Sequence, residues 1–558
     1  MRLAAASAAL ILGAGCRPTL APPQRGSTVR FAIAADPTAL NPLFIHPDAD
    51  AVDEQLAALQ FEPFVALDGR GRVVPVLLRE VPTRANGGIS RDGRTIIFHL
   101  RWSAVWSDGV PVTARDVLFT LRAILDPRNP VAVRDGYDLI ERASAPDPHT
   151  IVLRLRHAWA PAPVTLFSYG IAPYVVLPAH VLAGERDLAR ASFDRHPTVG
   201  DGPFILQSWR RGDRLVYAAN RRFWLGTPAV ARLDVRIVPA PQTNLVLLQS
   251  DALDWNLIAP SQRPALAGIS GLRFVRVPTT TVAAIAMNTA RPPLDDPRIR
   301  RALAMSIDRA LIARAVAFGV YPVAEAIQPR FSWAYDPRVR EPRYDPARAD
   351  RLLDAAGWRR GLDGIRRKNG RPLRLTYVAF PESSTGMHVA DVVQQELRAR
   401  GIAVTIKPVR LPLLLLPREG VLARGAFDLA YLVWSGGIDP DDSALLSCNA
   451  PQNVMRWCNA QVDALERRAV TGVDPERRAR TYAEIERIVA REVPLIVLFD
   501  AEYLYAYRAS LCGVAPGALL PDWNAWQWRR CRPAPAISEG TRPLSNRRRS
   551  SRASEGTT

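Results

Sequence analysis

The chain has 558 residues, which is too long for one hydrophobic core and predicts two or three domains. A hydrophobic fraction of 48% and a mean hydropathy of −0.05 are typical of a globular protein and exclude a polytopic membrane protein. The formal net charge is +19, but residues 529–558 hold eight arginines against two glutamates, and the other arginines are spread along the chain. Because no single basic stripe is visible, we expect no nucleic acid as a partner.

The first sixteen residues have the pattern of an export signal. Arg2 precedes a small and apolar run over 3–12, which ends at the sequence GAGC (13–16). The pattern is similar to a lipoprotein signal in which Cys16 becomes the acylated first residue, although Gly13 stands where leucine is usual. The alternative is a plain secretory signal. Either signal takes the mature chain out of the cytoplasm, and a linker rich in Pro, Arg and Ser follows at 17–28.

Four cysteines remain after Cys16, and they form two pairs that are local in the sequence. These pairs are Cys448 with Cys458 and Cys512 with Cys531. Four cysteines allow three connectivities, and we expect the local one. Export favours disulfides over buried free thiols, and each bridge would stabilise the fold by about 2–4 kcal/mol.

Residues 98–124 predict a strand, a sharp turn and a capped helix in succession. The strand passes Trp102 and Trp106 before the turn SDG (107–109). A helix is expected after Pro111, because Thr113 and Asp116 have the spacing of a capping box. Its predicted apolar face consists of Val117, Leu118, Leu121 and Leu125.

Two later helices are predicted to begin at an aspartate followed by a proline. Asp296 should cap the first, whose apolar face is predicted to contain Ile299, Leu303, Ile307 and Leu311. Asp345 should cap the second, which ends at Gly357. A helix at 388–400 and a strand at 402–406 follow, so helices and strands alternate and indicate an α/β fold.

The sequence offers no metal, cofactor or catalytic motif. The histidines show no HxxxH or HxH spacing and no CxxC exists, so no metal site is predicted. GxSxG, HExxH and a P-loop are also absent, and we therefore expect no enzyme. Gly69 and Gly71 lie in a charged hairpin turn, which is not a dinucleotide fingerprint.

The block WSDGVPVTARDV (106–117) resembles family 5 extracellular solute-binding proteins, the dipeptide, oligopeptide and nickel binders that serve ABC importers. Further blocks of the same family follow in family order and extend the resemblance over about 30–530. They are DPTALNP (36–42), PTVGDGPF (197–204), NRRFW (220–224), PLDDPRIRRA (293–302) and YDPARADRLLDAAGW (344–358).

The resemblance implies an α/β periplasmic-binding-protein-like fold of type II, with three domains and two lobes that close on a hinge. Domain I would combine 28–74, 204–290 and 495–532, domain II would be 75–203, and domain III would be 291–494. Residues 533–558 would form a disordered basic tail.

Residues 427–448 resemble the buried strand and the ligand-facing loop of the family. Trp434 would offer an aromatic face, and Ser435, Gly436 and Gly437 would offer polar groups. In peptide-binding relatives a carboxylate shortly after the Trp receives the α-amine. Here the loop is one residue shorter, so Asp439 either replaces that carboxylate or caps the turn before Pro440. Further candidate contacts implied by the resemblance are Leu40, Asn41, Tyr137 and Tyr503.

The implied function is capture of a peptide-like or other small polar solute for an ABC permease in the inner membrane. The protein would be a monomer in the periplasm or on the outer face of the cytoplasmic membrane, anchored through lipid on Cys16. The alternatives are a binder of an oligosaccharide or a nickel chelate, a sensory receptor on the same fold, and an extracytoplasmic hydrolase.

Overall fold

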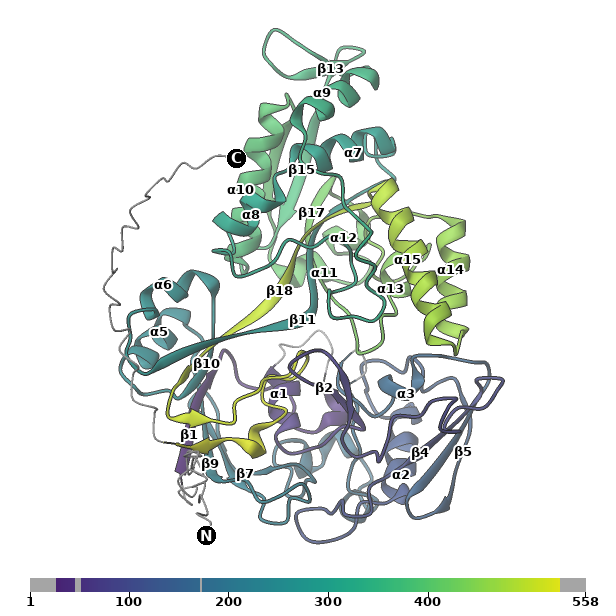
Figure 1. Ribbon diagram of the computed structural model, residues 1–558, viewed down its shortest axis with the longest axis vertical. Coiled ribbons are helices and arrows are strands. Elements are labelled where there is room, and N and C mark those ends of the chain that lie inside the picture. Colours follow the sequence, from purple (N-terminus) through teal and green to yellow (C-terminus); the bar gives the residue numbers. More distant parts are fainter. Residues whose placement is uncertain (1–26, 46–51, 171–172, 532–558) are drawn as a thin grey trace, which may run out of the picture.

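The computed structural model describes residues 27–45, 52–170 and 173–531, which form a lower and an upper lobe (Figure 1). The expected signal peptide at 1–16, most of the expected linker and the expected tail at 533–558 lie outside the described residues. The lower lobe contains a four-stranded and a three-stranded sheet, and the upper lobe is built around much of a six-stranded sheet.

The four-stranded sheet joins the start of the described chain to a segment far along it. Its order is β1 (Ser27–Ile33), β9 (Val230–Ile237), β8 (Arg214–Ala219) and β7 (Phe204–Arg210), with β1 parallel to β9. Alternate residues of β1 point inward and are buried in one core with β9 and β7, as period-two patterning requires. Shorter elements of this lobe are η1 (Pro42–Phe44), α1 (Val52–Ala58), β2 (Val65–Leu67), β3 (Val73–Pro75), α5 (Pro241–Gln249), η4 (Pro260–Gln262), α6 (Arg263–Leu266), β19 (Leu511–Cys512), η5 (Ala525–Gln527) and β20 (Arg529–Arg530).

The three-stranded sheet has the order β4 (Thr95–His99), β6 (Thr150–Leu155) and β5 (Ile140–Asp147), with α2 (Ala114–Leu125) beside it. The predicted capping box of α2 is confirmed, with Thr113 as N-cap and Asp116 as its reciprocal partner. The remaining short helices here are α3 (Ala162–Thr165), α4 (Ala179–Leu182), η2 (Leu188–Arg190) and η3 (Ser192–Asp194).

The predicted apolar face of α2 is wrong at its last residue. Leu125 is exposed, whereas Ile124 is fully buried with Val117 and Leu121 in the core. The helix ends directly after Leu125, so the last turn follows the packing of Ile124 rather than the extrapolated period. The two tryptophans before the helix also differ, because Trp106 is buried and Trp102 is exposed beneath Arg79.

The six-stranded sheet carries most of the upper lobe. Its order is β10 (Trp255–Ile258), β18 (Leu495–Arg508), β11 (Leu272–Met287), β17 (Leu429–Ser435), β15 (Arg374–Ala379) and β16 (Ala403–Pro408). Helices of the upper lobe cover it: α7 (Pro297–Ser306), α8 (Arg309–Ala315), α9 (Pro346–Ala355), α10 (Ser384–Ala399), α11 (Leu411–Leu415), α12 (Val421–Arg424), α13 (Ser443–Leu446), α14 (Ala460–Thr471) and α15 (Pro475–Glu492). A small sheet of β12 (Arg359–Arg360), β13 (Arg366–Lys368) and β14 (Arg371–Pro372) lies at its tip. The expected alternation of helices and strands is confirmed.

One predicted helix is two helices. Asp296 caps α7 as expected, but the helix ends at Ser306 because Ile307 adopts an extended backbone, and Asp308 caps a new helix, α8. Leu311, expected on the apolar face, is consequently exposed. The second aspartate-proline start is confirmed, since Asp345 accepts the backbone N–H of Arg348 at the start of α9.

Two long strands, β11 and β18, run from one lobe into the other (Figure 1). They pair antiparallel along most of their length, with two register breaks. In the larger break Pro278 faces Glu502 and Val282 faces Asp500, and the smaller one lies between Ala283 and Ala284. The three threonines at 279–281 therefore share one facing residue and form a bulge, which bends a sheet locally.

Both cysteine pairs are local disulfides in the structure, as expected from the sequence. Cys448 is bonded to Cys458 beside α13 and α14, with their Cα atoms 4.6 Å apart. Cys512 is bonded to Cys531 at the hairpin of β19 and β20, with a Cα separation of 6.0 Å. Each bridge fixes the end of a segment that carries little regular structure.

Gly202 is required by a close approach of two backbones. A Cβ atom at this position would lie 2.6 Å from the carbonyl carbon of Gln60, whose oxygen accepts the Gly202 N–H at 2.8 Å. We expect Gly202→Ala to lower the free energy of unfolding by about 1–3 kcal/mol, because the backbone of Gln60 has to move. Urea unfolding measures this, and Gly184→Ala, whose Cβ would meet nothing within 4 Å, is the matched control. Equal effects of the two substitutions would contradict the prediction.

Candidate functional site

A small cavity lies where the two lobes meet, beside the ligand-facing loop predicted from the sequence. It has a volume of about 30 Å³, which is room for about two water molecules. The lower lobe contributes Leu67, Gly71 and Val73 of the β2–β3 hairpin. The strand β11 contributes Thr280, and the upper lobe contributes residues of the segments 328–333 and 434–440.

The lobes touch at this cavity. Gly71 has a φ of +72°, and a Cβ there would overlap the ring of Phe331 on the opposite lobe. Ile438 packs against the core of the lower lobe, and the backbone N–H of Ala160 donates to the carbonyl of Val470 at 2.6 Å. The structure is therefore a closed arrangement in which little space remains for a solute.

Trp434, which is a predicted ligand contact, forms one wall of the cavity. Its side chain is 8% exposed and belongs to the core between the sheet and α14 and α15. The indole N–H donates to Gln452 Oε1 at 2.9 Å, so the ring is fixed in orientation. Trp434 therefore has two roles here, as interior packing and as a rigid apolar wall.

The next residues connect the cavity to the bulge in β11. The Gly436 N–H donates to the carbonyl of Thr280 at 2.9 Å, and the Ser435 hydroxyl lies 2.8 Å from that of Thr281. Gly436 and Gly437 line the cavity, whereas the Ser435 side chain contacts Thr281. The loop is thus held by the same residues that interrupt the pairing of β11 and β18.

Asp439 lines the cavity but is not a free carboxylate. Arg478 on α15 donates from Nη1 to Oδ2 at 2.8 Å and from Nη2 to Oδ1 at 2.6 Å, and both side chains are buried. Trp333 covers the guanidinium, 5.0 Å from ring centre to Cζ. The bidentate ion pair satisfies Asp439 internally, so it does not stand ready for a ligand ammonium group as one sequence hypothesis required.

Gln328 is held beside the cavity by buried polar groups of the upper lobe. Its side-chain amide donates to the carbonyl of Pro440 at 2.8 Å and to Asp442 at 3.2 Å, and its backbone N–H donates to Glu486 at 2.9 Å. Burial raises the pKa of Glu486 to about 8 and also raises the pKa of Asp442 above its usual range. This network fixes the turn after Asp439 from behind.

Four predicted contact residues lie elsewhere. Leu40 is buried in the core around β1, and the Asn41 side chain caps η1 by accepting the N–H of Leu43. Tyr137 is fully buried in the core of the lower lobe, where its hydroxyl accepts the Phe167 N–H at 2.8 Å. Tyr503 lies in β18 with its ring against Tyr505, and burial raises its pKa. None of the four lines the cavity, because each is committed to packing or capping.

The sequence reasoning missed Arg478, Gln328 and Phe331. Arg478 lies four residues before Tyr482 and seven before Ile485, so helical spacing places it on the buried face of α15, and this signal was not used. Gln328 and Phe331 belong to an irregular segment between α8 and α9, for which periodicity carries no signal. The two aromatic residues Phe331 and Trp333 are the feature of this segment that could have indicated a ligand contact.

Within 27–45, 52–170 and 173–531, no three His, Cys, Asp or Glu side chains converge in a way that could hold a metal ion. No helix in the same ranges is long and apolar enough to cross a membrane. The lining of the cavity consists mainly of aromatic and apolar side chains and glycine backbone, with the amide of Gln328.

The arrangement defines a two-lobed solute-binding protein. The sequence profile of bacterial extracellular solute-binding proteins, family 5 Middle, matches residues 72–455. The chain belongs to this family, as its sequence blocks predicted.

Similar proteins cover nearly the whole chain. It is 27% identical to the probable ABC transporter periplasmic-binding protein SapA of Escherichia coli (strain K12), over 93% of this chain and 95% of that protein. It is also 27% identical to di/tripeptide-binding protein 2 of Pseudomonas aeruginosa (strain UCBPP-PA14), over 80% and 84% of the two chains. Both relatives are described as binding proteins.

Solved structures confirm the expected type of fold. The oligopeptide-binding protein AppA from Bacillus subtilis, in complex with a nonapeptide, matches with a TM-score of 0.74 at 21% identity, over 92% of this chain and 100% of that chain. The ABC transporter substrate-binding protein CtaP from Listeria monocytogenes matches with a TM-score of 0.80 at 20% identity, over 91% and 100%. At these identities the likeness shows the fold alone.

Proposed function

We propose that this protein is the extracytoplasmic substrate-binding component of an ABC importer and captures a peptide-like or other small polar solute. The observation that carries the proposal is the cavity between the lobes, which joins a fixed aromatic wall, Trp434, to the backbone of Gly436 and Gly437. Backbone and aromatic groups of this kind recognise amides and flat or extended chains. The partner would be the membrane permease of the importer.

The mechanism would be binding followed by closure, with no covalent bond made or broken. An open form would expose Trp434 and the glycine backbone, and the hairpin carrying Gly71 would then return toward Phe331 over the solute. A solute of several residues needs a cavity far larger than about 30 Å³, so the hairpin has to stand further from the upper lobe when a ligand is bound.

The ion pair between Asp439 and Arg478 narrows the solute class. A free α-amine would need a carboxylate that is not already neutralised, because an unpaired buried ammonium is costly. We therefore expect the bound solute to be recognised through amide and apolar groups rather than through an amine at Asp439. A solute whose ammonium displaced Arg478 would contradict this expectation.

We further propose that the mature protein is an exported monomer with Cys16 as its acylated first residue. The GAGC sequence at 13–16 supports this, and the two disulfides fit an oxidising compartment. The proposed domains remain 28–74 with 204–290 and 495–532, then 75–203, then 291–494. Mass spectrometry of the N-terminal peptide from the native host would detect the acyl groups, and an unmodified N-terminus would refute the anchor.

Native mass spectrometry of the protein purified from its own host is the test of the binding function. We expect a co-purified solute, and we expect Trp434→Ala to lose it or to bind it at least ten times more weakly, because the aromatic wall is removed. Trp102→Ala is the matched control, since Trp102 is 68% exposed and lies away from the cavity. If both variants retain the solute equally, this cavity is not the binding site.

A further inference from the structure

A second cavity lies on the surface of the upper lobe, outside the site between the lobes. It is a groove of about 560 Å³, formed by α7, the segment 338–345, the start of α9 and the end of α15. Seven of its lining residues are arginines and one is an acid, Asp345. This arginine groove is defined by Arg301, Arg338, Arg340, Arg343, Arg348, Arg487 and Arg491.

Only part of this positive charge is neutralised. Arg338 donates to Asp336 at 2.9 Å, and Arg487 donates to the other oxygen of the same carboxylate at 2.6 Å. Arg491 lies 3.7 Å from Glu492. The other four arginines of the groove have no carboxylate at ion-pairing distance among the residues that the structure describes.

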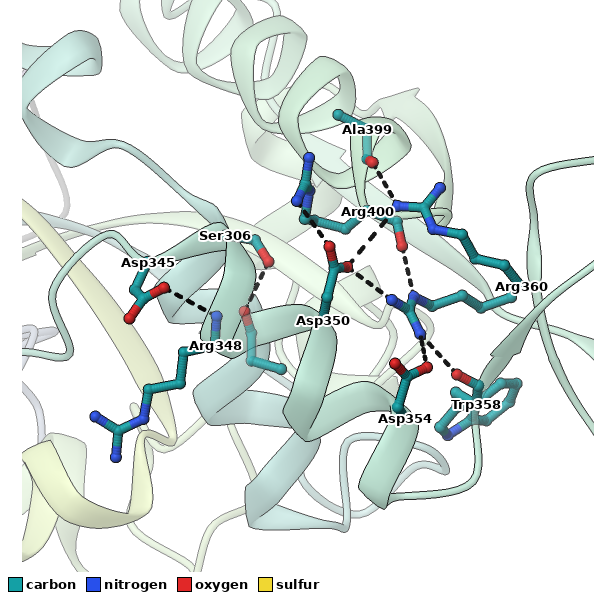
Figure 2. Close-up of polar contacts among 11 residues, drawn as sticks. Ser306, Asp345, Arg348, Asp350, Asp354, Trp358, Arg360, Ala399 and Arg400 are labelled. Atoms are coloured by element: carbon teal, nitrogen blue, oxygen red, sulfur yellow. Dashed lines mark hydrogen bonds and ion pairs between the residues drawn. The ribbon is translucent and has the colours of Figure 1, made fainter.

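Several other arginines of this arginine-rich chain are neutralised by carboxylates. On a different face of α9, Asp350 accepts from both Arg366 and Arg400, and Asp354 also accepts from Arg366 (Figure 2). In the same view the guanidinium of Arg348 extends away from that network, with no partner drawn. A separate surface groove, on the lower lobe, is lined by three arginines and three acids, namely Arg122, Arg128, Arg186, Asp126, Glu185 and Asp187.

Some guanidiniums of the groove are oriented by backbone carbonyls. Arg301 donates from Nη2 to the carbonyl of Arg491 at 2.6 Å, and Arg340 donates from Nη1 to that of Val339 at 2.7 Å. Each of these bonds uses one nitrogen of the guanidinium and leaves other N–H groups available for a ligand. The last turn of α15 also lies in the groove, and the negative end of its dipole offsets part of the repulsion among the arginines.

We propose that the arginine groove binds an anion that carries more than one phosphate group, or a phosphate with further acidic groups. Planar guanidinium forks match phosphate oxygens, and several unneutralised forks in one concavity favour a multiply charged ligand. The volume of about 560 Å³ lies within the range of small-molecule sites. The same chemistry is offered by a soluble diphosphate and by the headgroups of anionic phospholipids. This inference does not depend on the identity of the solute held between the lobes.

Calorimetric titration with pyrophosphate tests whether the groove binds a soluble anion. The unmodified groove should bind with a Kd at or below about 1 mM at low ionic strength, and more weakly as salt is added. The double variant Arg343→Gln/Arg348→Gln should bind at least ten times more weakly. The control Arg122→Gln/Arg186→Gln removes the same charge from the balanced groove and should leave the affinity unchanged. Equal weakening in both variants would overturn the proposal, since net charge alone would then explain the binding.

Vesicle sedimentation tests the lipid source. A chain with Cys16→Ser, which cannot be acylated, is mixed with phosphatidylcholine vesicles that do or do not contain cardiolipin, whose headgroup carries two phosphates. Sedimentation that requires cardiolipin and is at least halved in the groove variant, but not in the control, supports a lipid headgroup. Pyrophosphate binding without such a difference assigns the groove to a soluble anion.

If neither pyrophosphate nor the lipid vesicles bind through the groove, the proposed anion site is refuted. Because residues 529–558 are also basic, vesicle binding that the groove variant retains in full counts against the proposal. Thermal unfolding midpoints equal to that of the parent chain are expected for both double variants, because all four substituted side chains are exposed. If the groove variant Arg343→Gln/Arg348→Gln has a lowered midpoint, the variant Arg340→Gln/Arg343→Gln is used in its place, because it leaves α9 unchanged.

Discussion

Replacing Arg478 by Met is expected to lower the free energy of unfolding by about 3–5 kcal/mol. The substitution leaves the buried carboxylate of Asp439 without the two N–H donors that now satisfy both of its oxygens. Desolvation of an uncompensated charge is the reason for the large effect. Urea unfolding at pH 7 measures it.

The neighbouring Arg477 provides the matched control. It is exposed and lies 4.0 Å from Asp474, so Arg477→Met should change the stability by no more than about 0.5 kcal/mol. Adding Asp439→Leu to Arg478→Met should recover most of the loss, because both charges are then absent. Similar losses for the Arg477 and Arg478 variants, or no recovery in the double variant, would show that the ion pair does not act as described.

Replacing Glu486 by Gln is expected to stabilise the protein at pH 8 and to have little effect near pH 4.5. Burial raises the pKa of Glu486 to about 8, and the carboxylates of Asp442 and Glu341 contribute to the rise. The folded state therefore holds this proton more tightly than the unfolded state, and stability is lost as the pH rises from about 4.5 to about 8. A glutamine side chain stays neutral throughout, so the gain at pH 8 is on the order of 4 kcal/mol.

Thermal and urea unfolding at a series of pH values measure this gain. Glu476→Gln on the same helix is the control, because its side chain is 87% exposed and should give no pH-dependent difference. The amide oxygen introduced by Glu486→Gln can still accept the backbone N–H of Gln328, so the contact to the cavity is kept. A difference between the variant and the parent chain that does not change with pH would contradict the assignment to this proton.

Local signals in the sequence were sufficient to predict where the helices with a polar N-cap begin. Thr113 with Asp116, and Asp345 with its following proline, fix helix starts through contacts a few residues apart, and both were predicted correctly. Ile307 is buried as predicted, but the helix does not continue through it, so Leu311 was wrongly placed on the apolar face; packing rather than the apolar period decides where α7 ends.

The candidate site was predictable only in its loop. Trp434, Gly436 and Gly437 follow a buried strand, and this neighbourhood can be recognised along the chain. The partners that determine how the loop behaves come from far away, since Arg478 and Gln328 meet Asp439 and Pro440 only after α15 and the segment before α9 have packed. Tyr137 was assigned by loose correspondence, and its burial in another core could not be read from one sequence.

The bulge at 279–281 lies where the two strands that join the lobes lose their pairing, and this is where we expect the hinge of lobe closure. Thr280 and Thr281 hold Gly436 and Ser435, and the same threonines interrupt the pairing of the two strands that join the lobes. Points near such a hinge would move least during closure, and the hairpin carrying Gly71 would move most. A solute that contacts Thr280 and the backbone of Gly436 would keep these contacts throughout closure, so the residues that determine initial binding would differ from those that enclose the solute.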